Sequence, residues 1–379
     1  MSHRSRARRA LTPLALACVI SVLAGCGLSG TPSGSSSPSS GGDSAAGSVA
    51  VNNATHPATS TLCGSKPIKI VFQMDFDTTW GAISYAELQK EAKSCPNVTT
   101  EYVNSSGDQQ KAITNLQSAV AKGVDGIVLY PGFGQSELPA IAAAYKAGIP
   151  IVPFNAVVGG EPGEDFTAFV TQDQVQIGRD QAEWIGKQLG GKGDIAFLGG
   201  PDGNSSTAAI FSGFTEVLSK EYPAINVLTG NPVATDWTAS GTQQSMAGLL
   251  ARFSTIDGIV ADYGAPFPGA IRAYQAAGKP LPIVATDGGS NELACSWLGY
   301  AQSGQKFLSL DGSTLIIQVA FRKVLSAISG VSDNEADTLT LYPFIDTAAG
   351  KQPQCFPDLP PGADLSGDLS PSDLKDLIG

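Results

Sequence analysis

The sequence predicts an α/β protein of two lobes, each a doubly wound parallel sheet. From Lys66 onward, short apolar runs rich in β-branched residues alternate with amphipathic segments of helical length. Continuous apolar runs of this kind are typical of parallel strands that helices cover on both faces. The alternation extends over roughly 280 residues, which is more than one sheet comfortably holds, so two domains are expected.

Eight runs are predicted to be strands, and the segments between them to be helices. The predicted strands are residues 68–74, 99–103, 125–130, 149–154, 194–199, 225–230, 257–262 and 281–286. Helical segments such as 109–123 often end at a glycine, a common helix terminator. Residues 126–154 and 258–286 share one order of strand, aromatic loop, helix, glycine and Pro-led strand. This shared order indicates a structural duplication.

The N-terminal segment is predicted to be a secretory signal followed by a lipid anchor. Residues 1–25 place four arginines ahead of an apolar stretch too short to span a bilayer. The LAGC sequence resembles the lipobox of bacterial lipoproteins, in which the signal is cut before the cysteine, here Cys26, and that cysteine carries lipid. Residues 26–62 are rich in Ser, Gly and Pro and predict a flexible tether. The folded part is then expected on the outer face of the cell membrane; a plain signal peptide with a chance cysteine is the alternative.

The chain carries an acid excess that argues against two kinds of partner. Its formal net charge is −11, and removal of residues 1–25, with four arginines and no acids, makes it −15. Nucleic acid and anionic lipid surfaces both require clustered Lys and Arg. No nucleic-acid partner is therefore expected, and membrane contact is expected only through the lipid anchor. Such acidity is also simply common in secreted proteins.

Four cysteines fall in the predicted folded part: Cys63, Cys95, Cys295 and Cys355. An even number in an oxidising compartment suggests two disulfides, although four cysteines allow three pairings. Cys63 precedes the first strand and Cys95 follows the first helix, which returns the chain to the same edge. This placement favours a Cys63–Cys95 bond and leaves Cys295 with Cys355.

Sequence motifs for metals, cofactors and common catalysis are missing. The chain has no CxxC, and its two histidines, His3 and His56, lie in the signal and the tether. It has no GxGxxG, GxxxxGK[ST] or GxSxG, and no Ser-His-Asp or Cys-His nucleophile can form without a histidine. An acid pair for glycoside hydrolysis, Asp75 with Asp77, would stand too close for an inverting mechanism. No metal, cofactor or enzymatic activity is expected.

The order of elements resembles one family of transport proteins. The KAGIPIVPFN and AAGKPLPIVATDG junctions and the lipoprotein start look like the type I periplasmic sugar-binding proteins of ABC importers, the ribose-binding group. The resemblance covers roughly residues 66–345 and implies two lobes that close around one small polar ligand. Three implied crossovers lie near residues 155–160, 286–292 and 309–313. The implied first lobe is 66–155 plus 287–309, the second lobe is 156–286 plus 310–345, and 346–379 form a C-terminal extension.

Candidate ligand-binding residues follow the ends of the predicted strands. In open α/β sheets a ligand binds beyond the carboxyl ends of the strands, where loops converge. A sugar or polyol presents apolar C–H faces and a rim of hydroxyls, so it needs aromatic planes and carboxylate or amide acceptors. The candidates chosen on this basis are Gln73, Asp75, Asp77, Trp80, Tyr130, Asn155, Asp202, Asn204, Trp237, Tyr263, Asp287 and Asp311.

The family resemblance implies roles for four of these candidates. Trp80 and Trp237 match the aromatic residues that stack on the ligand ring from opposite lobes. Asp77 and Asp287 match polar positions that hold hydroxyls. Purely structural alternatives exist: core packing for Trp80, Tyr130 and Tyr263, a hydrophobic staple for Trp237, an N-cap for Asp77, and a turn for Asp202 with Asn204.

Two arginines of the family pattern are missing. Asn155 stands where pentose-binding members use an acid, and Ala156 stands where an arginine usually follows. A second arginine, expected early in the segment SSTAAIFSGF, is also absent. A pocket rich in acids without these arginines suggests a polyhydroxylated or a cationic ligand rather than ribose.

The expected function is the capture of a small polar solute, most simply a sugar or polyol, and its delivery by a monomer to an ABC permease. A ligand-sensing receptor of the same fold, which presents its ligand to a membrane signalling partner, is the alternative. Sugar-responsive repressors share the fold, but a signal and a tether stand here where they carry a DNA-binding headpiece.

Overall fold

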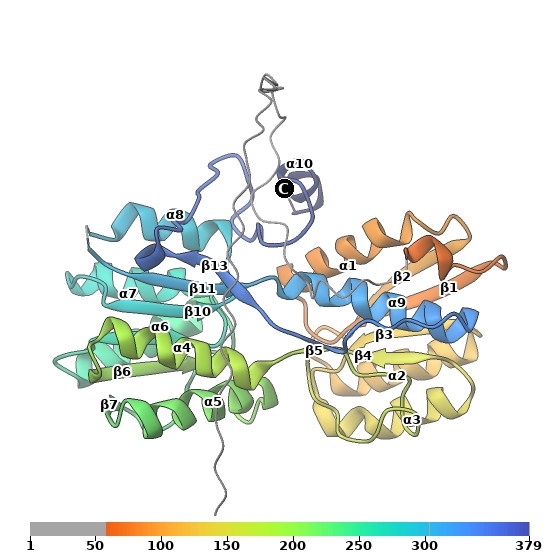
Figure 1. The fold of residues 1–379 in the computed structure, drawn as a ribbon, viewed down its shortest axis with the longest axis horizontal. Helices are drawn as coiled ribbons and strands as arrows, with labels where there is room; N and C mark the ends of the chain where they lie inside the picture. Colours follow the sequence, from red (N-terminus) through yellow and green to blue (C-terminus); the bar gives the residue numbers. More distant parts are fainter. Residues whose placement is uncertain (1–57, 303, 379) are drawn as a thin grey trace, which may run out of the picture. The chain divides into compact units, whose positions relative to one another are not determined.

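Two parallel sheets, each covered by helices, carry the part of the chain that the structure describes (Figure 1). The computed structural model describes residues 58–302 and 304–378, all within the compact unit Ala45–Gly379. The predicted signal peptide, Cys26 and the tether up to residue 57 lie outside the described residues. The last four residues of the predicted tether belong to the folded part, because Thr59–Thr61 form a turn of 3-10 helix and Leu62 is fully buried in the core. The predicted α/β class is confirmed.

All eight predicted strands are present, and five further strands were not predicted. The strands are β1 Ile68–Met74, β2 Val98–Asn104, β3 Gly126–Tyr130, β4 Ile151–Pro153, β5 Thr171–Gln172, β6 Lys192–Gly199, β7 Ala224–Val227, β8 Val233–Ala234, β9 Gly258–Ala261, β10 Ile283–Asp287, β11 Phe307–Asp311, β12 Thr338–Leu339 and β13 Tyr342–Asp346. The helices are α1 Thr79–Ala92, α2 Gln109–Ala121, α3 Leu138–Lys146, α4 Gln174–Gln188, α5 Ser205–Glu221, α6 Ala239–Arg252, α7 Pro268–Ala277, α8 Asn291–Tyr300, α9 Ile316–Ser329 and α10 Pro371–Ile378. Short 3-10 turns are η1 Thr59–Thr61, η2 Gly134–Glu137, η3 Ser313–Leu315 and η4 Thr347–Ala349.

The first lobe is built on a four-stranded parallel sheet in the order β2-β1-β3-β4. Strand β1 reads IKIVFQM and buries every residue except Lys69, as expected of a central strand covered on both faces. Helix α9 packs on β3, β4 and α1 of this sheet, although it follows the strands of the other lobe in the chain (Figure 1). Phe72, Phe154 and Phe321 are fully buried in this shared core.

The second lobe is built on a larger sheet in the order β13-β11-β10-β9-β6-β7, with β8 paired to β6. All of its pairings are parallel except that of β13 with β11, which is antiparallel and shifts register between Ser309 and Leu310. Helices α4 and α5 pack together, and α6, α7 and α8 form a second group through their contacts with α7. The carboxyl ends of β6, β9 and β10 carry the loops that reach the site described below.

The chain passes between the two sheets three times. It leaves the first lobe at β5, returns between β11 and α9 through residues 312–315, and leaves again at β12. Strands β5 and β12 pair with each other in parallel and form a separate two-stranded ribbon. The first passage lies later than the predicted 155–160, because Val158 and Phe166 still pack in the core of the first lobe.

Two predicted segment assignments are wrong. The predicted crossover at 286–292 is absent, because β10 continues through α8 to β11, and β11 pairs with β10 in the second sheet. Residues 287–309 therefore belong to the second lobe and not to the first. Helix α9, within the 310–345 assigned to the second lobe, packs on the first sheet. Hydrogen-bond partners decide these memberships, and the partner of a strand cannot be read from its own sequence.

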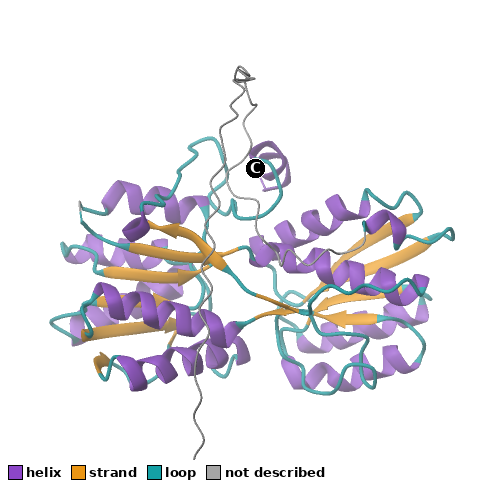
Figure 2. Cartoon of the chain, viewed as in Figure 1, coloured by secondary structure: helices purple, strands orange, loops and turns teal. Residues whose placement is uncertain are grey.

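The C-terminal segment 347–378 contacts both lobes (Figure 2). The disulfide Cys295–Cys355 bonds it to α8, and Asn291 Nδ2 donates to the carbonyl oxygen of Phe356 at 2.8 Å. At its other end α10 packs on α1. The N-terminus of α10 is capped, since Ser370 Oγ accepts from the N–H of Asp373 at 3.2 Å.

The second disulfide joins Cys63 to Cys95, with Cα atoms 5.3 Å apart. Both favoured pairings are thus present in the structure. Glu87 of α1 adds a polar connection to the C-terminal segment, because its Oε1 accepts from the N–H groups of Asp368 and Leu369 at 2.7 and 3.0 Å.

Candidate ligand-binding site

A cavity of about 90 Å³ lies at the carboxyl ends of strands from both sheets. Because one water molecule needs about 10–15 Å³ on this measure, the cavity has room for roughly six to nine water-sized groups. A cavity of this size suits a single small molecule. The lining residues are Met74, Phe76, Thr78, Trp80, Tyr130, Asn155, Gln172, Ser206, Ile210, Trp237, Asp262, Tyr263, Asp287, Gly288 and Ser313.

Trp80 forms the aromatic wall of the first lobe. It lies in the first turn of α1, and its ring centroid is 5.7 Å from that of Tyr130 and 5.9 Å from that of Phe154. Its Nε1 donates to Ser313 Oγ at 3.1 Å, a hydroxyl on the passage between β11 and α9. The indole ring is therefore oriented both by its own lobe and by the chain that joins the lobes.

Trp237 forms the aromatic wall of the second lobe, and its position is fixed by unusual backbone geometry. Asp236 and Trp237 both have positive φ angles, 52° and 50°, which non-glycine residues rarely adopt. The Trp237 Nε1 donates to Asp262 Oδ1 at 3.1 Å. Its ring lies directly over Gly200, where any side chain would collide with it. The strained loop, the hydrogen bond and the glycine together hold this ring in one orientation.

Asp262 is the buried group that supports Trp237. Besides the indole N–H, it accepts from the Gly200 N–H at 3.0 Å and from Thr207 Oγ1. Burial raises the pKa of Asp262 to about 6, although the hydrogen bonds from Thr207, Trp237 and Gly200 lower it. Asp262 thus orients the Trp237 ring and also lines the cavity itself.

The polar wall consists of Asn155, Gln172 and Asp287, and each has one buried side-chain oxygen without a hydrogen-bond partner. These oxygens are Asn155 Oδ1, Gln172 Oε1 and Asp287 Oδ1. Gln172 Nε2 donates to the other Asp287 oxygen at 3.4 Å, so the two side chains are neighbours. Asn155 has a φ of 64°, and its carbonyl oxygen accepts from Gln174 Nε2 at 2.9 Å. Buried polar atoms are normally paired, so three unpaired acceptors in one cavity indicate a binding site.

The cavity is acidic and, among the described residues, no Lys or Arg lines it. Burial raises the pKa of Asp287 well above its ordinary value, and the nearby carboxylates of Asp311, Asp262 and Asp364 raise it further. Burial also raises the pKa of Tyr263, which keeps its hydroxyl neutral and available as a hydrogen-bond partner.

Half of the sequence candidates line the cavity. They are Trp80, Tyr130, Asn155, Trp237, Tyr263 and Asp287. They come from both lobes, as the predicted two-lobed site requires. Whether each contacts a ligand stays a prediction.

The other six candidates lie outside the cavity lining. Asp75 is buried behind it, where it accepts from Gln73 Nε2, Ser105 Oγ and the Gly132 N–H at 3.2, 2.9 and 2.7 Å. Asp77 and Asp202 are exposed. Asn204 caps α5 by accepting from the N–H groups of Ser206 and Thr207, and Asp311 accepts from Ser366 Oγ at 2.9 Å next to the crossover.

The segment from the end of β1 into α1 contributes one candidate, Trp80, to the cavity lining and leaves three outside it. Met74, Phe76, Thr78 and Trp80 line the cavity, whereas Gln73, Asp75 and Asp77 do not. Gln73 and Met74 end β1, where successive side chains point to opposite faces. Asp75 is held away from the cavity by its hydrogen bonds to Ser105 Oγ and the Gly132 N–H, and Trp80 enters it from the first turn of α1. The apolar and aromatic residues Met74, Phe76 and Trp80 line the cavity, and a search for acids in this segment does not find the first two.

Two further lining residues, Gln172 and Ser313, come from the passages between the lobes. Sequence reasoning that looked only beyond strand ends could not find them. Asp262 directly precedes Tyr263 at the end of β9 and satisfied the same criterion, so it could have been chosen with that tyrosine.

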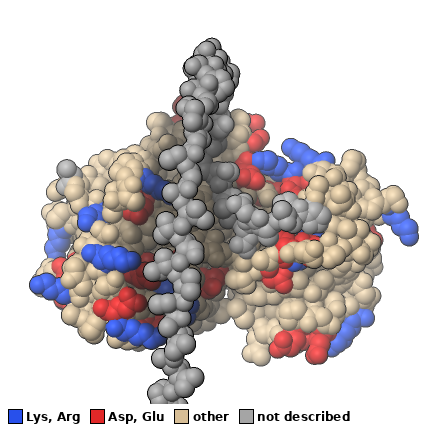
Figure 3. Space-filling model, viewed as in Figure 1, with Lys and Arg blue, Asp and Glu red and all other residues tan. Residues whose placement is uncertain are grey.

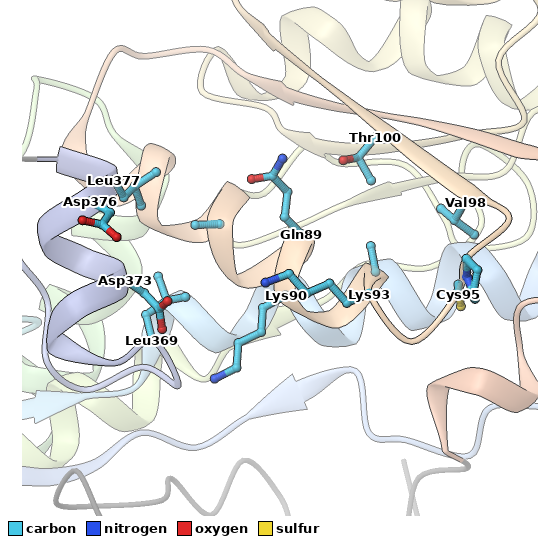
Figure 4. Close-up of a pocket in the computed structure, with 13 residues that line it drawn as sticks. Gln89, Lys90, Lys93, Cys95, Val98, Thr100, Leu369, Asp373, Asp376 and Leu377 are labelled. Carbon is cyan, nitrogen blue, oxygen red and sulfur yellow. The ribbon is translucent and has the colours of Figure 1, made fainter. Parts of the chain in front are cut away.

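A larger concavity of about 640 Å³ lies elsewhere, in the groove between α1 and α10 (Figure 4). Its lining includes Lys90, Lys93, Asp373 and Asp376, whose charged groups face solvent. It lacks the unpaired buried oxygens and paired aromatic walls of the cavity between the sheets. On the face shown in Figure 3, acidic and basic side chains are also mixed, as they are in this groove. We therefore assign the ligand site to the smaller cavity.

Comparisons with known proteins agree with this geometry. Residues 70–304 match the periplasmic binding protein domain family. A xylitol-binding protein of Mycolicibacterium smegmatis is 31% identical over 194 residues, which cover 51% of this chain and 54% of that protein. The ribose import binding protein of Bacillus subtilis is 27% identical over 207 residues, which cover 55% of this chain and 65% of that protein. The chain thus spans between half and two thirds of the length of these relatives.

A solved structure shares the fold. The periplasmic binding protein component of the arabinose ABC transporter from Shewanella sp. ANA-3, bound to L-arabinofuranose, has a TM-score of 0.64 at 18% identity, over 72% of this chain and 89% of that one. In residues 58–302 and 304–378, none of the helices has the length and apolarity needed to cross a membrane.

Proposed function

Because the chain belongs to the periplasmic binding protein family, we propose that it is a solute-binding protein of an ABC importer that holds one polyhydroxylated molecule between its lobes. The observation that carries the proposal is the cavity walled by one tryptophan from each lobe and edged by three unpaired oxygens. Two relatives bear names that specify polyol or sugar binding, xylitol and ribose, which supports this class of ligand.

The chemistry of the cavity suits a polyol or sugar. The C–H faces of such a molecule lie against the rings of Trp80 and Trp237, which bury apolar surface. Its hydroxyls donate to the free oxygens of Asn155, Gln172 and Asp287, which would otherwise stay buried without partners. We expect the protein to release its ligand without chemical change, because the relatives are binding proteins and not enzymes.

Ligand binding is expected to favour a closed arrangement of the lobes. The residues of the cavity come from both sheets and from the passages between them, so only a closed arrangement satisfies all contacts at once. The closed protein then delivers its ligand to the membrane permease. Lipid at Cys26 and the Ser/Gly/Pro-rich tether would keep the protein at the outer face of the cell membrane, near the permease.

Isothermal titration calorimetry with xylitol, D-ribitol, D-ribose, D-xylose, L-arabinose and D-allose tests the binding proposal. At least one compound is expected to bind with a micromolar or lower Kd and to be recovered unchanged. Failure of every compound, or turnover of any, would refute the proposal. For the anchor, Cys26→Ala is expected to move the protein from the membrane fraction to the medium, and retention of the variant in the membrane fraction would refute lipidation at this residue.

A further inference from the structure

The unpaired atoms of the cavity are all acceptors. Gln172 turns its NH₂ group toward Asp287 whenever that carboxylate is ionised, because its carbonyl oxygen there would face a second acceptor. Its Oε1 is therefore fixed as a free acceptor, next to the free Oδ1 of Asp287. Gln172 and Asp287 are only 6% and 5% exposed, so water outside the protein cannot satisfy these oxygens. A suitable ligand must bring hydrogen-bond donors to this wall.

The same wall carries negative charge without a compensating cation. The charged groups that act most strongly on Asp287 are themselves acids, namely Asp311, Asp262 and Asp364. Two arginines of the described residues form ion pairs with other acids: Arg272 with Glu292 at 3.1 Å and Arg322 with Glu91 at 2.8 Å. A buried carboxylate without a positive partner is strongly unfavourable, so either a proton or a cation must accompany it.

The remaining walls also suit a cation. Trp80 and Tyr130 on one side, and Trp237 and Tyr263 on the other, present aromatic rings to the cavity. Aromatic faces attract ammonium groups through their quadrupole, and the attraction is larger where water is excluded. Such rings hold organic cations rather than metal ions, which require several oxygen or nitrogen ligands.

We propose that the ligand is an amino sugar or amino polyol whose ammonium group binds at Asp287 and Gln172. The proposal rests on the function proposed above and narrows its ligand class. An ammonium group has three N–H donors; two reach Asp287 Oδ1 and Gln172 Oε1, and the ligand's hydroxyls serve Asn155 Oδ1. The cation supplies positive charge to a cavity that no Lys or Arg of the described residues lines.

A matched pair of ligands tests the proposal: 1-amino-1-deoxy-D-xylitol against xylitol, and D-glucosamine against D-glucose, by calorimetry at pH 7. In each pair the amine is expected to bind at least about tenfold tighter, as a charge-assisted hydrogen bond exceeds a neutral one. Asp287→Asn should remove this preference. Asp358→Asn, an exposed acid of the C-terminal segment away from the cavity, should retain it.

Proton exchange gives a second readout. Because the ammonium favours the ionised carboxylate, binding of the amine should release protons from the wild type, and the measured enthalpy should vary with the ionisation enthalpy of the buffer. The Asp287→Asn variant should show no such variation. Tighter binding of the neutral partner, or an amine preference that survives in Asp287→Asn, would overturn the cationic class while leaving polyol binding intact. Absence of binding by both members of both pairs and by the wider sugar panel would overturn both proposals.

Discussion

Gly200→Ala should weaken ligand binding without damaging the fold. An ideal Cβ at this residue would lie 2.5 Å from Cζ2 and 2.7 Å from Nε1 of the Trp237 ring, whereas 3.4 Å is an ordinary contact. Gly200 does not have a positive φ, so alanine fits its backbone. The ring must therefore move by about 1 Å, which would stretch its 3.1 Å hydrogen bond to Asp262 beyond bonding distance.

The expected loss follows from these two interactions. Loss of a hydrogen bond to a charged group costs about 1.5–3 kcal/mol, and poor ring stacking costs about 1 kcal/mol more. The displaced ring costs free energy in the unliganded protein as well, so only part of the total weakens binding. We expect a 10-fold to 100-fold rise in Kd for the tightest ligand of the sugar panel, about 1.4–2.8 kcal/mol. Calorimetry measures the change, and indole fluorescence reports the displaced ring.

Gly248→Ala is the matched control. Gly248 lies within α6, has no atom within 4 Å of an added Cβ and has no positive φ. The Gly248→Ala variant should bind the ligand as the wild type does and gain up to about 1 kcal/mol of stability from helix propensity. Wild-type affinity in Gly200→Ala, with the control also unchanged, would show that the orientation of Trp237 is irrelevant to binding.

Three further outcomes are expected. Trp80→Ala should raise the ligand Kd by about 10-fold to 100-fold, measured by calorimetry, because it removes the stacking plane of the first lobe; an unchanged Kd would refute the stacking role. Burial raises the pKa of Glu87 from 4.5 to about 7, so the wild type should lose up to about 3 kcal/mol of unfolding free energy as pH rises from 4.5 to 7. Glu87→Gln should flatten this part of the urea-denaturation profile, and an equally steep variant would contradict the assignment. Replacing Cys295 and Cys355 together by serine should cost about 2–4 kcal/mol, because their bond closes a loop of 60 residues; equal urea midpoints would contradict this.

The sequence predicted the local elements well because their signals are local. The β-branched runs that became β1, β3, β6 and β10 are buried nearly throughout, so composition alone identified them. Membership of a sheet depends on partners far along the chain, and there the prediction was wrong. Residues 307–311 pair with β10 through backbone hydrogen bonds that no property of FLSLD specifies.

The candidate cavity was predictable in its location, and its lining residues only in part. Strand ends led to Trp80, Tyr263 and Asp287, because the carboxyl ends of parallel strands meet at one edge of a sheet. Selection by chemical type misled for Asp75, whose carboxylate accepts from Ser105 Oγ and the Gly132 N–H behind the cavity. Gln172 was out of reach, since its strand has only two residues and forms at a crossover whose position was not foreseen.

The C-terminal segment connects the spacing of the two lobes to residues that do not line the cavity. Because the segment is bonded covalently to α8 and packs on α1, any change in the spacing of the lobes must bend it or break its contacts. Glu87 holds its backbone and lies outside the cavity lining. A free-energy difference of about 1.4 kcal/mol changes the ratio of two states tenfold. We therefore expect residues beyond the family match at 70–304 to change the balance between open and closed lobes, and with it the affinity for a ligand.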